Sequence, residues 1–375
     1  MKKRMGLMGM LVVAGLMAGA ETPLPELLKM KDGTAVTSAA QWPARRAELV
    51  SLMTAREFGV RPVERPDTLA FEVLGPDQKL YQDQVVLRKV KISAKGPYGD
   101  FAFNAYLYLP PEAKRVPAFV YPYLEVMWGH DGITPETPET PSLPVQAIAA
   151  RGYAVLVFNT AEVAPDDKQP GNELSRGVFA AFGPKARTAT SWGTISAWAW
   201  GASRGLDFLE TQPEIDASRV AVIGHSRGGK TALCAGLTDE RFALTVSNDS
   251  GCSGAKLNRM DLPKSESVER ITRVFPHWFC LDYLANAKRA CDVDYDQHFL
   301  AGAIAPRGLY IASGTEDLWA GPAGEKRTAE LATEAWKLFG HPERVGYHIR
   351  PGKHALLAYD WMRYIDFFNA LSLRP

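Results

Sequence analysis

The sequence has few cysteines, and they lack the spacing of a metal or redox site. Its 375 residues include four, Cys234, Cys252, Cys280 and Cys291. No two of them form a Cys-x-x-Cys pair, which argues against zinc and thiol-redox roles. We expect Cys234 to be a buried free thiol. Three pairings of the four are possible and the sequence does not decide among them; Cys280–Cys291 is the candidate disulfide.

The sequence also lacks a strong charge and a hydrophobic run long enough to span a membrane. The formal net charge is +1, so nothing predicts nucleic acid or an acidic membrane as a partner. Residues 2–4 are basic, 6–17 are apolar and uncharged, and 18–20 are small. This layout predicts a signal peptide cleaved after Ala20, with an uncleaved membrane anchor as the alternative. Cleavage removes three cations, changing the charge from +1 to −2 and leaving a secreted or periplasmic protein.

Strand and helix patterns alternate through the rest of the chain, which has no repeat and no linker rich in proline and glycine. Alternating apolar residues predict antiparallel strands at 68–74, 84–93 and 101–109. Continuous apolar runs predict buried parallel strands, and helical periodicity marks helices before, between and after them. The runs lie at 117–121, 153–158, 220–223, 242–246 and 309–312, and the helices at 42–58, 143–151, 191–210 and 356–371. We therefore expect one α/β domain over residues 21–375, a mostly parallel sheet with helices on both faces. Residues 129–144 and 161–187 are predicted loops over the strand ends.

One turn carries the strongest chemical signal. Residues 224–233 read Gly-His-Ser-Arg-Gly-Gly-Lys-Thr-Ala-Leu after an apolar strand. Ser226 between two glycines fits a nucleophile elbow, with the N–H of Arg227 directed at a developing oxyanion. The same letters fit a nucleotide-binding P-loop, Gly-x-x-x-x-Gly-Lys-Thr. Predicted export and several strands before the turn favour the elbow, in which Lys230 could meet an anionic substrate group.

A serine nucleophile needs a base and an acid that orients the base. His354 lies on a glycine-containing loop before the last predicted helix, which makes it the candidate base. Asp317 and Asp249 each follow a predicted strand and are both candidate acids, with Asp317 preferred. The order serine, acid, histidine is the order of the α/β-hydrolase fold.

The elbow and several further segments resemble glucuronoyl esterases of carbohydrate esterase family 15, especially bacterial members. The resemblance covers nearly the whole mature chain. The segments include Ser-Asn-Asp-Ser-Gly-Cys-Ser-Gly at 247–254, Phe-Pro-His-Trp-Phe at 275–279, Glu-Asp-Leu-Trp-Ala at 316–320 and Gly-Lys-His at 352–354.

The resemblance implies an α/β-hydrolase that cleaves esters between (4-O-methyl-)glucuronic acid on xylan and lignin alcohols. It implies Ser226 as nucleophile and His354 as base, with Arg227 stabilising the oxyanion through its backbone and its guanidinium. Lys230 and Trp319 would hold the uronate, and Glu266 would sit at the sugar. In this family the acid occurs at either the Asp317 or the Asp249 position.

From this comparison we expect a monomeric serine esterase that needs no metal or cofactor. A xylan deacetylase that uses the same residues is the alternative function.

Overall fold

The structure is a computed structural model that describes residues 23–123, 133–167, 176–183, 186–260 and 262–371. The predicted signal peptide, residues 1–20, lies outside the described residues, as do parts of the predicted loops at 129–144 and 161–187. Within the described ranges, no helix is both long enough and apolar enough to cross a membrane.

A single mixed sheet forms the centre of the described chain. Its strands follow the order β1-β3-β4-β6-β5-β7-β8-β9-β10, with β2 paired to β3. From β6 to β10 in this order neighbouring strands run parallel, whereas β1, β2, β3 and β4 pair antiparallel and β4 meets β6 antiparallel. The bounds are β1 Ala70–Val73, β2 Gln78–Leu80, β3 Val85–Gly96, β4 Gly99–Leu109, β5 Val116–Tyr123, β6 Ala154–Asn159, β7 Ile215–His225, β8 Leu244–Asn248, β9 Gly308–Gly314 and β10 Val345–Arg350.

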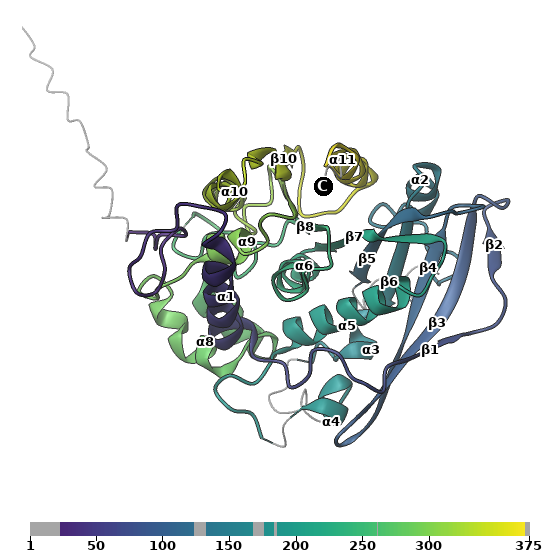
Figure 1. Ribbon diagram of the computed structural model, residues 1–375, viewed down its shortest axis with the longest axis horizontal. Helices are drawn as coiled ribbons and strands as arrows, with labels where there is room; N and C mark the ends of the chain where they lie inside the picture. The colour runs from purple at the N-terminus through teal and green to yellow at the C-terminus, as the bar shows by residue number, and fades with distance from the viewer. Residues whose placement is uncertain (1–22, 124–132, 168–175, 184–185, 261, 372–375) are drawn as a thin grey trace, which may run out of the picture.

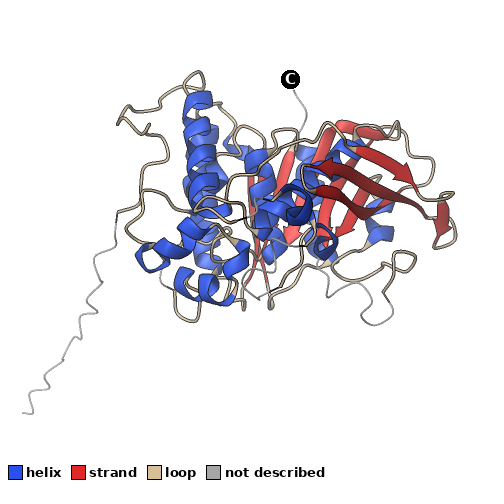
Figure 2. Ribbon diagram, turned by 90° about the horizontal axis from the view of Figure 1, so that it is seen from below, coloured by secondary structure: helices blue, strands red, loops and turns tan. Residues whose placement is uncertain are grey.

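Helices cover both faces of this sheet. Figure 1 shows α5 and α6 on one side of the parallel strands and α2 and α11 on the other. In Figure 2 the helices gather at one end of the molecule and the antiparallel strands at the other. The bounds are α1 Trp42–Met53, α2 Val145–Ala150, α3 Thr160–Val163, α4 Val178–Phe182, α5 Thr194–Leu209, α6 Arg227–Thr238, α7 Val268–Val274, α8 Leu281–Asn286, α9 Gln297–Gly302, α10 Pro322–Lys337 and α11 Ala358–Ala370.

Strand β5 shows how the sequence produces two cores. Successive side chains of a strand point to opposite faces. Ala118 and Val120 accordingly pack in the core beneath α5 and α6. Phe119 and Tyr121 pack in the second core, where their rings meet Trp361 of α11. A strand that is apolar at every position therefore needs a helix layer on each face, which confirms the predicted three-layer α/β architecture.

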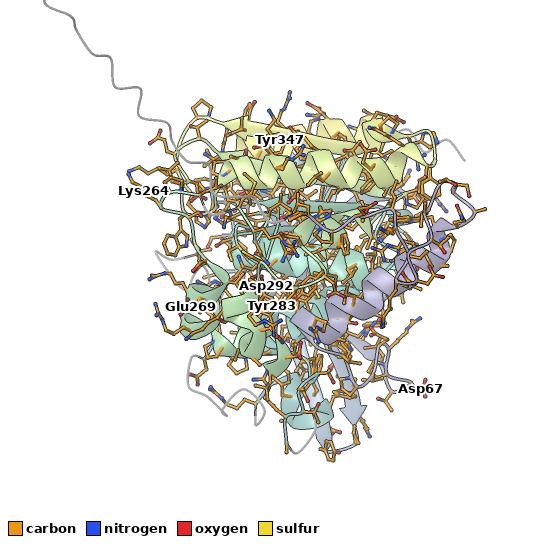
Figure 3. The ribbon with its side chains drawn as sticks, turned by 90° about the vertical axis from the view of Figure 1, so that its left-hand side faces the viewer. Asp67, Lys264, Glu269, Tyr283, Asp292 and Tyr347 are labelled. Carbon is orange, nitrogen blue, oxygen red and sulfur yellow. The ribbon has the colours of Figure 1, made fainter. Side chains whose placement is uncertain are left out.

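The sequence predicted no helix or strand between β9 and α11, but this segment forms both. Helix α10 packs on the sheet, and β10 extends it as an edge strand. Figure 3 shows Tyr347 of β10 beside α10, where its hydroxyl donates to Pro322 O at 3.3 Å. His348 of β10 is buried, and its Nε2 lies 2.8 Å from Asp360 Oδ1. Helices α3 and α4 likewise interrupt the segment predicted to be a loop from 161 to 187.

The candidate disulfide Cys280–Cys291 is also wrong, since all four cysteines are free thiols. Cys280 is buried at the start of α8 and its Sγ donates to Ala55 O at 3.6 Å. Cys291 is exposed beyond the 3-10 turn that follows α8. These helical turns separate the two sulfurs. Cys234 is buried and free, as predicted.

Candidate active site

The turn between β7 and α6 holds Ser226 in a strained backbone conformation. Its φ is 59° and its ψ is −124°, a region that residues with a side chain rarely adopt. The flanking glycines permit the turn, because a Cβ on Gly224 would lie 1.9 Å from Gly228 O. A hydrogen bond from Ser226 N to Asn248 O, 2.9 Å long, ties the turn to β8. The close approach of Gly224 to the next helix thus sets the sharp reversal expected of a nucleophile elbow.

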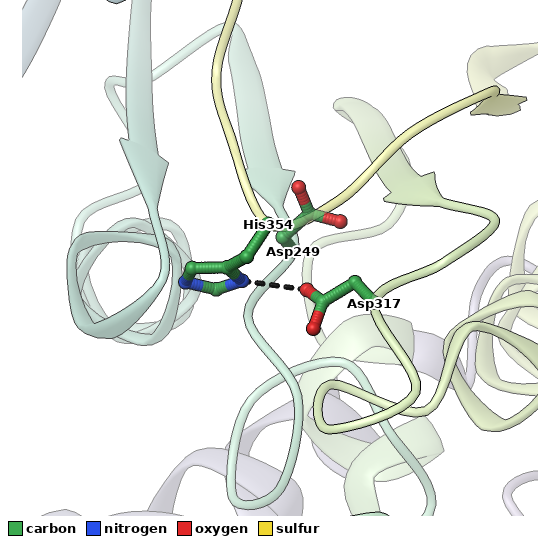
Figure 4. Close-up of side chains that lie close together, drawn as sticks. All are labelled: Asp249, Asp317 and His354. Carbon is green, nitrogen blue, oxygen red and sulfur yellow. Dashed lines mark hydrogen bonds and ion pairs between the residues drawn. The ribbon is translucent and has the colours of Figure 1, made fainter.

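His354 and Asp317 meet at the carboxyl ends of the parallel strands. His354 Nδ1 lies 2.5 Å from Asp317 Oδ2, and Asp249 lies beside them (Figure 4). The imidazole is 41% exposed, whereas the Asp317 side chain is only 3% exposed. The ring of His225, which precedes Ser226, lies 4.5 Å from the ring of His354 between centroids. The loop after β10 therefore brings this histidine next to the serine turn, with its other nitrogen, Nε2, free of the carboxylate.

Asp249 is held by other groups. Its Oδ1 accepts a hydrogen bond from Gly314 N at 2.7 Å, and its Oδ2 lies 3.3 Å from both Ala355 N and the Arg350 guanidinium. Asp249 thus supports the loops on both sides of the pair, while Asp317 is the acid bonded to the histidine. The sequence left both open, and the geometry favours Asp317.

The two carboxyl groups differ in their electrostatics. Burial would raise the pKa of Asp317, but its hydrogen bond to His354 and the charge of that histidine lower it below 3.8. Burial and the nearby charge of Asp317 raise the pKa of Asp249 to about 6. Burial and the charge of His354 lower the pKa of His225 to about 3, which keeps His225 neutral. Near pH 7 these shifts leave Asp317 ionised beside His354.

The raised pKa of Asp249 predicts a stability effect. Because the folded state binds this proton more tightly than the unfolded state, its contribution to stability is fully present below pH 3.8 and is lost as the pH rises through about 6. Asn at this position cannot ionise, so the stability of Asp249→Asn relative to wild type should increase between pH 4 and pH 7. Thermal unfolding of both proteins at the two pH values measures this difference. A stability difference unchanged between them would contradict the assignment.

Arg350 fixes the loop that carries His354. Its buried guanidinium contacts Asp249 and Asp360, and it donates to the carbonyl oxygens of Lys353 and Ala355. Nothing local in the sequence distinguishes Arg350 from a surface arginine, so it could not be predicted.

Removing this guanidinium leaves two buried carboxylates without their partner. We expect Arg350→Gln to lower the free energy of unfolding by about 3 kcal/mol. Arg327→Gln is the matched control, because it breaks only a surface pair with Glu330 and should cost about 0.5 kcal/mol or less. Chemical unfolding of both variants measures these changes. Equal decreases in the free energy of unfolding would show that the buried contacts of Arg350 do not stabilise the fold.

Arg227 begins α6 immediately after the serine. Its Nη1 forms an ion pair with Asp166, a residue that the sequence analysis did not single out. His277, in the Phe-Pro-His-Trp-Phe segment, is buried and its Nε2 lies 2.8 Å from the same aspartate. These contacts join three separate segments next to the serine turn.

The residues predicted to contact substrate lie on neighbouring segments. Lys230 is buried on α6 and its Nζ donates to Ser250 O. Burial raises the pKa of Glu266, partly offset by the charge of Lys230. The N–H of Glu266 donates to Trp319 O at 3.0 Å, so these two residues lie next to each other. Trp319 is 44% exposed, and the centroid of its ring lies 4.6 Å from Cζ of Arg270.

Donor atoms of Asp249, Asp317 and His354 lie within 4.8 Å of one another, a spacing that a metal ion could bridge. Their existing partners argue against that use. His354 Nδ1 is engaged with Asp317, and Asp249 receives backbone N–H groups. This arrangement suits a base and its orienting acid better than a ligand set.

The mostly parallel sheet, the strained serine turn and the adjacent histidine–aspartate pair together define an α/β-hydrolase. Comparison with known proteins narrows the class. The model of the family described as glucuronyl esterase, fungi, matches residues 133–340. Carbohydrate esterase MZ0003, from an unknown prokaryotic organism, is 36% identical over 389 residues, 92% of this chain and 88% of that protein. The chain belongs to the glucuronoyl esterases, carbohydrate esterase family 15, and is a carboxylic ester hydrolase.

Two further relatives are also glucuronoyl esterases by name. The 4-O-methyl-glucuronoyl methylesterase of Phanerochaete carnosa is 28% identical over 88% of this chain and 76% of its own length. The glucuronoyl esterase structure from Solibacter usitatus superposes with a TM-score of 0.84 at 32% identity, covering 94% of this chain and 99% of that one. Family membership favours the elbow over the P-loop at residues 224–231, and the bond from Lys230 to Ser250 O accounts for the lysine without a nucleotide.

Proposed function

We propose that this protein hydrolyses esters of glucuronic acid and 4-O-methylglucuronic acid, in particular those linking xylan to lignin alcohols. One observation carries the proposal: the strained Ser226 turn lies next to the His354–Asp317 pair in a member of this family. In support, a relative named 4-O-methyl-glucuronoyl methylesterase aligns with 88% of the chain.

The proposed chemistry is acyl transfer in two steps. His354 Nε2 takes the proton of the Ser226 hydroxyl as its Oγ attacks the ester carbonyl. Asp317 holds the imidazole by Nδ1 and stabilises the imidazolium, while the N–H and guanidinium of Arg227 stabilise the oxyanion. The imidazolium then returns its proton to the departing alcohol. Water, deprotonated by His354, attacks the acyl-enzyme and releases the glucuronic acid.

Substrate selection would fall to Lys230, Glu266 and Trp319. An exposed tryptophan ring offers a flat apolar face to a sugar, and a lysine and a carboxyl can hydrogen-bond its hydroxyls. We also propose that residues 1–20 are a signal peptide, that residues 21–375 form one domain, and that the protein acts as a monomer outside the cytoplasm.

The test compares two substrates with the same preparation of residues 21–375. We expect kcat/KM for a benzyl ester of glucuronic acid to exceed that for acetate release from acetylated xylan by about tenfold or more, a difference near 1.4 kcal/mol in transition-state binding. Exhaustive dialysis against a chelator should leave the rate unchanged. A preference for acetylated xylan would instead support the deacetylase alternative.

A further inference from the structure

Asp166 lies at the centre of a set of charged and aromatic groups beside the serine turn. It follows α3, and its side chain is only 16% exposed. One carboxylate oxygen, Oδ2, pairs with Nη1 of Arg227. The other, Oδ1, lies 2.8 Å from both His277 Nε2 and Trp278 Nε1. A single carboxylate thus joins the start of α6 to the 3-10 turn Pro276–Trp278.

This carboxylate stays ionised although it is largely buried. Burial would raise the pKa of Asp166, but the hydrogen bond from His277 and the charge of Arg227 lower it below 3.8. The contact with Arg227 is therefore a full ion pair near pH 7. Such a pair in a partly desolvated site is stronger than one on the surface.

Two aromatic rings restrict the guanidinium from another side. Phe275 and Trp278 stack with centroids 3.9 Å apart and an angle of 6° between their planes. Cζ of Arg227 lies 5.6 Å from the first centroid and 5.1 Å from the second, within the range of a cation–π interaction. Trp278 takes part in both contacts, since its ring packs against the arginine while its N–H donates to Asp166. The arginine is thus held before any substrate binds.

We propose that Asp166 is a positioning residue for ester hydrolysis, acting through Arg227. This inference rests on the proposed function, in which the guanidinium meets the charge that develops on the carbonyl oxygen. Because Asp166 engages Nη1, at one corner of the guanidinium, the group keeps other N–H donors for the oxyanion. A donor that is already oriented needs no reorganisation during the reaction, so the benefit falls on kcat rather than on substrate binding.

The chain provides a matched control one residue away. Asp167 lies on the same segment, and its carboxylate pairs with Arg176 instead of Arg227. Asp167→Asn therefore makes the same change of charge on the same segment and leaves the ion pair between Asp166 and Arg227 intact. Asp166→Asn removes the charge but keeps the shape of the side chain and one acceptor oxygen for Trp278 and His277.

The experiment measures kcat and KM for a benzyl glucuronate ester with wild type, Asp166→Asn, Asp167→Asn, Arg227→Ala and the double variant Asp166→Asn/Arg227→Ala. We expect Asp166→Asn to lower kcat about tenfold to a hundredfold, with KM changed by less than about threefold. Asp167→Asn should match wild type. In the Arg227→Ala background, Asp166→Asn should lower kcat by less than about twofold, because the guanidinium that Asp166 positions is absent.

The outcomes separate this inference from the proposed function. If wild type does not hydrolyse the ester, the proposed function fails and the inference falls with it. If wild type is active and Asp166→Asn retains its kcat, the inference alone is overturned. An equal loss of kcat with and without Arg227 also overturns it, because Asp166 would then act on the fold and not through the arginine.

Discussion

Replacing Ser226 with alanine is expected to lower kcat for glucuronoyl esters by about 10⁴-fold or more, because the acyl-enzyme loses the only oxygen on which it can form. The oxyanion donors would remain and account for the residual rate. Steady-state kinetics of the purified variant measure the loss. The residue is half-buried, and alanine meets the same backbone strain as serine at the φ of 59° that this turn imposes, so the fold should persist.

Two controls accompany this variant. Its thermal unfolding should stay close to that of wild type, and it should still bind the product glucuronate. A Ser226→Ala protein that turns over the ester at near wild-type rate would rule out the serine as the nucleophile.

Asp317→Asn is expected to cause the second large loss of kcat. We expect it to lower kcat by about 10³-fold or more, since an amide that donates to Nδ1 forces the tautomer in which Nε2 holds a proton and cannot accept one from serine. Asp249→Asn should lower kcat by about tenfold at most, because that carboxylate contacts backbone N–H groups and Arg350 and not the imidazole. The pH dependence of kcat for both variants completes the measurement.

The reverse ranking would identify Asp249 as the working acid. The double variant Asp317→Asn/Asp249→Asn discriminates further. If Asp249 substitutes when Asp317 is lost, the double variant loses more activation free energy than the two single variants together. If Asp249 only supports the loops, the two losses add.

The fold was predictable from the sequence because its main signals are local. Continuous apolar runs marked the buried strands, and the glycines around Ser226 marked a turn whose geometry they alone permit. The order of Ser226, Asp317 and His354 placed their loops at one edge of the sheet. Parallel strands bring their carboxyl ends together, so sequence order was sufficient to select candidates that do lie close together.

What could not be predicted depends on contacts between distant segments. Asp166 and Arg227 are 61 residues apart, and Arg350 reaches Asp249 across 101 residues. A single sequence contains no pattern for such pairs. Strand β10 escaped notice because an edge strand that reads Val-Gly-Tyr-His-Ile-Arg lacks an apolar run. The choice between Asp317 and Asp249 also required the loop conformations, since both follow strands that end at the same edge.

Trapping the covalent intermediate tests the central claim most directly. Wild-type protein is mixed with a benzyl glucuronate ester, quenched in acid during the first turnovers, digested and analysed by mass spectrometry. The account predicts a glucuronoyl adduct on the peptide that contains Ser226, formed as benzyl alcohol is released. A glucuronoyl adduct on a different residue, or one on Ser226 that forms far more slowly than the ester turns over, would contradict it.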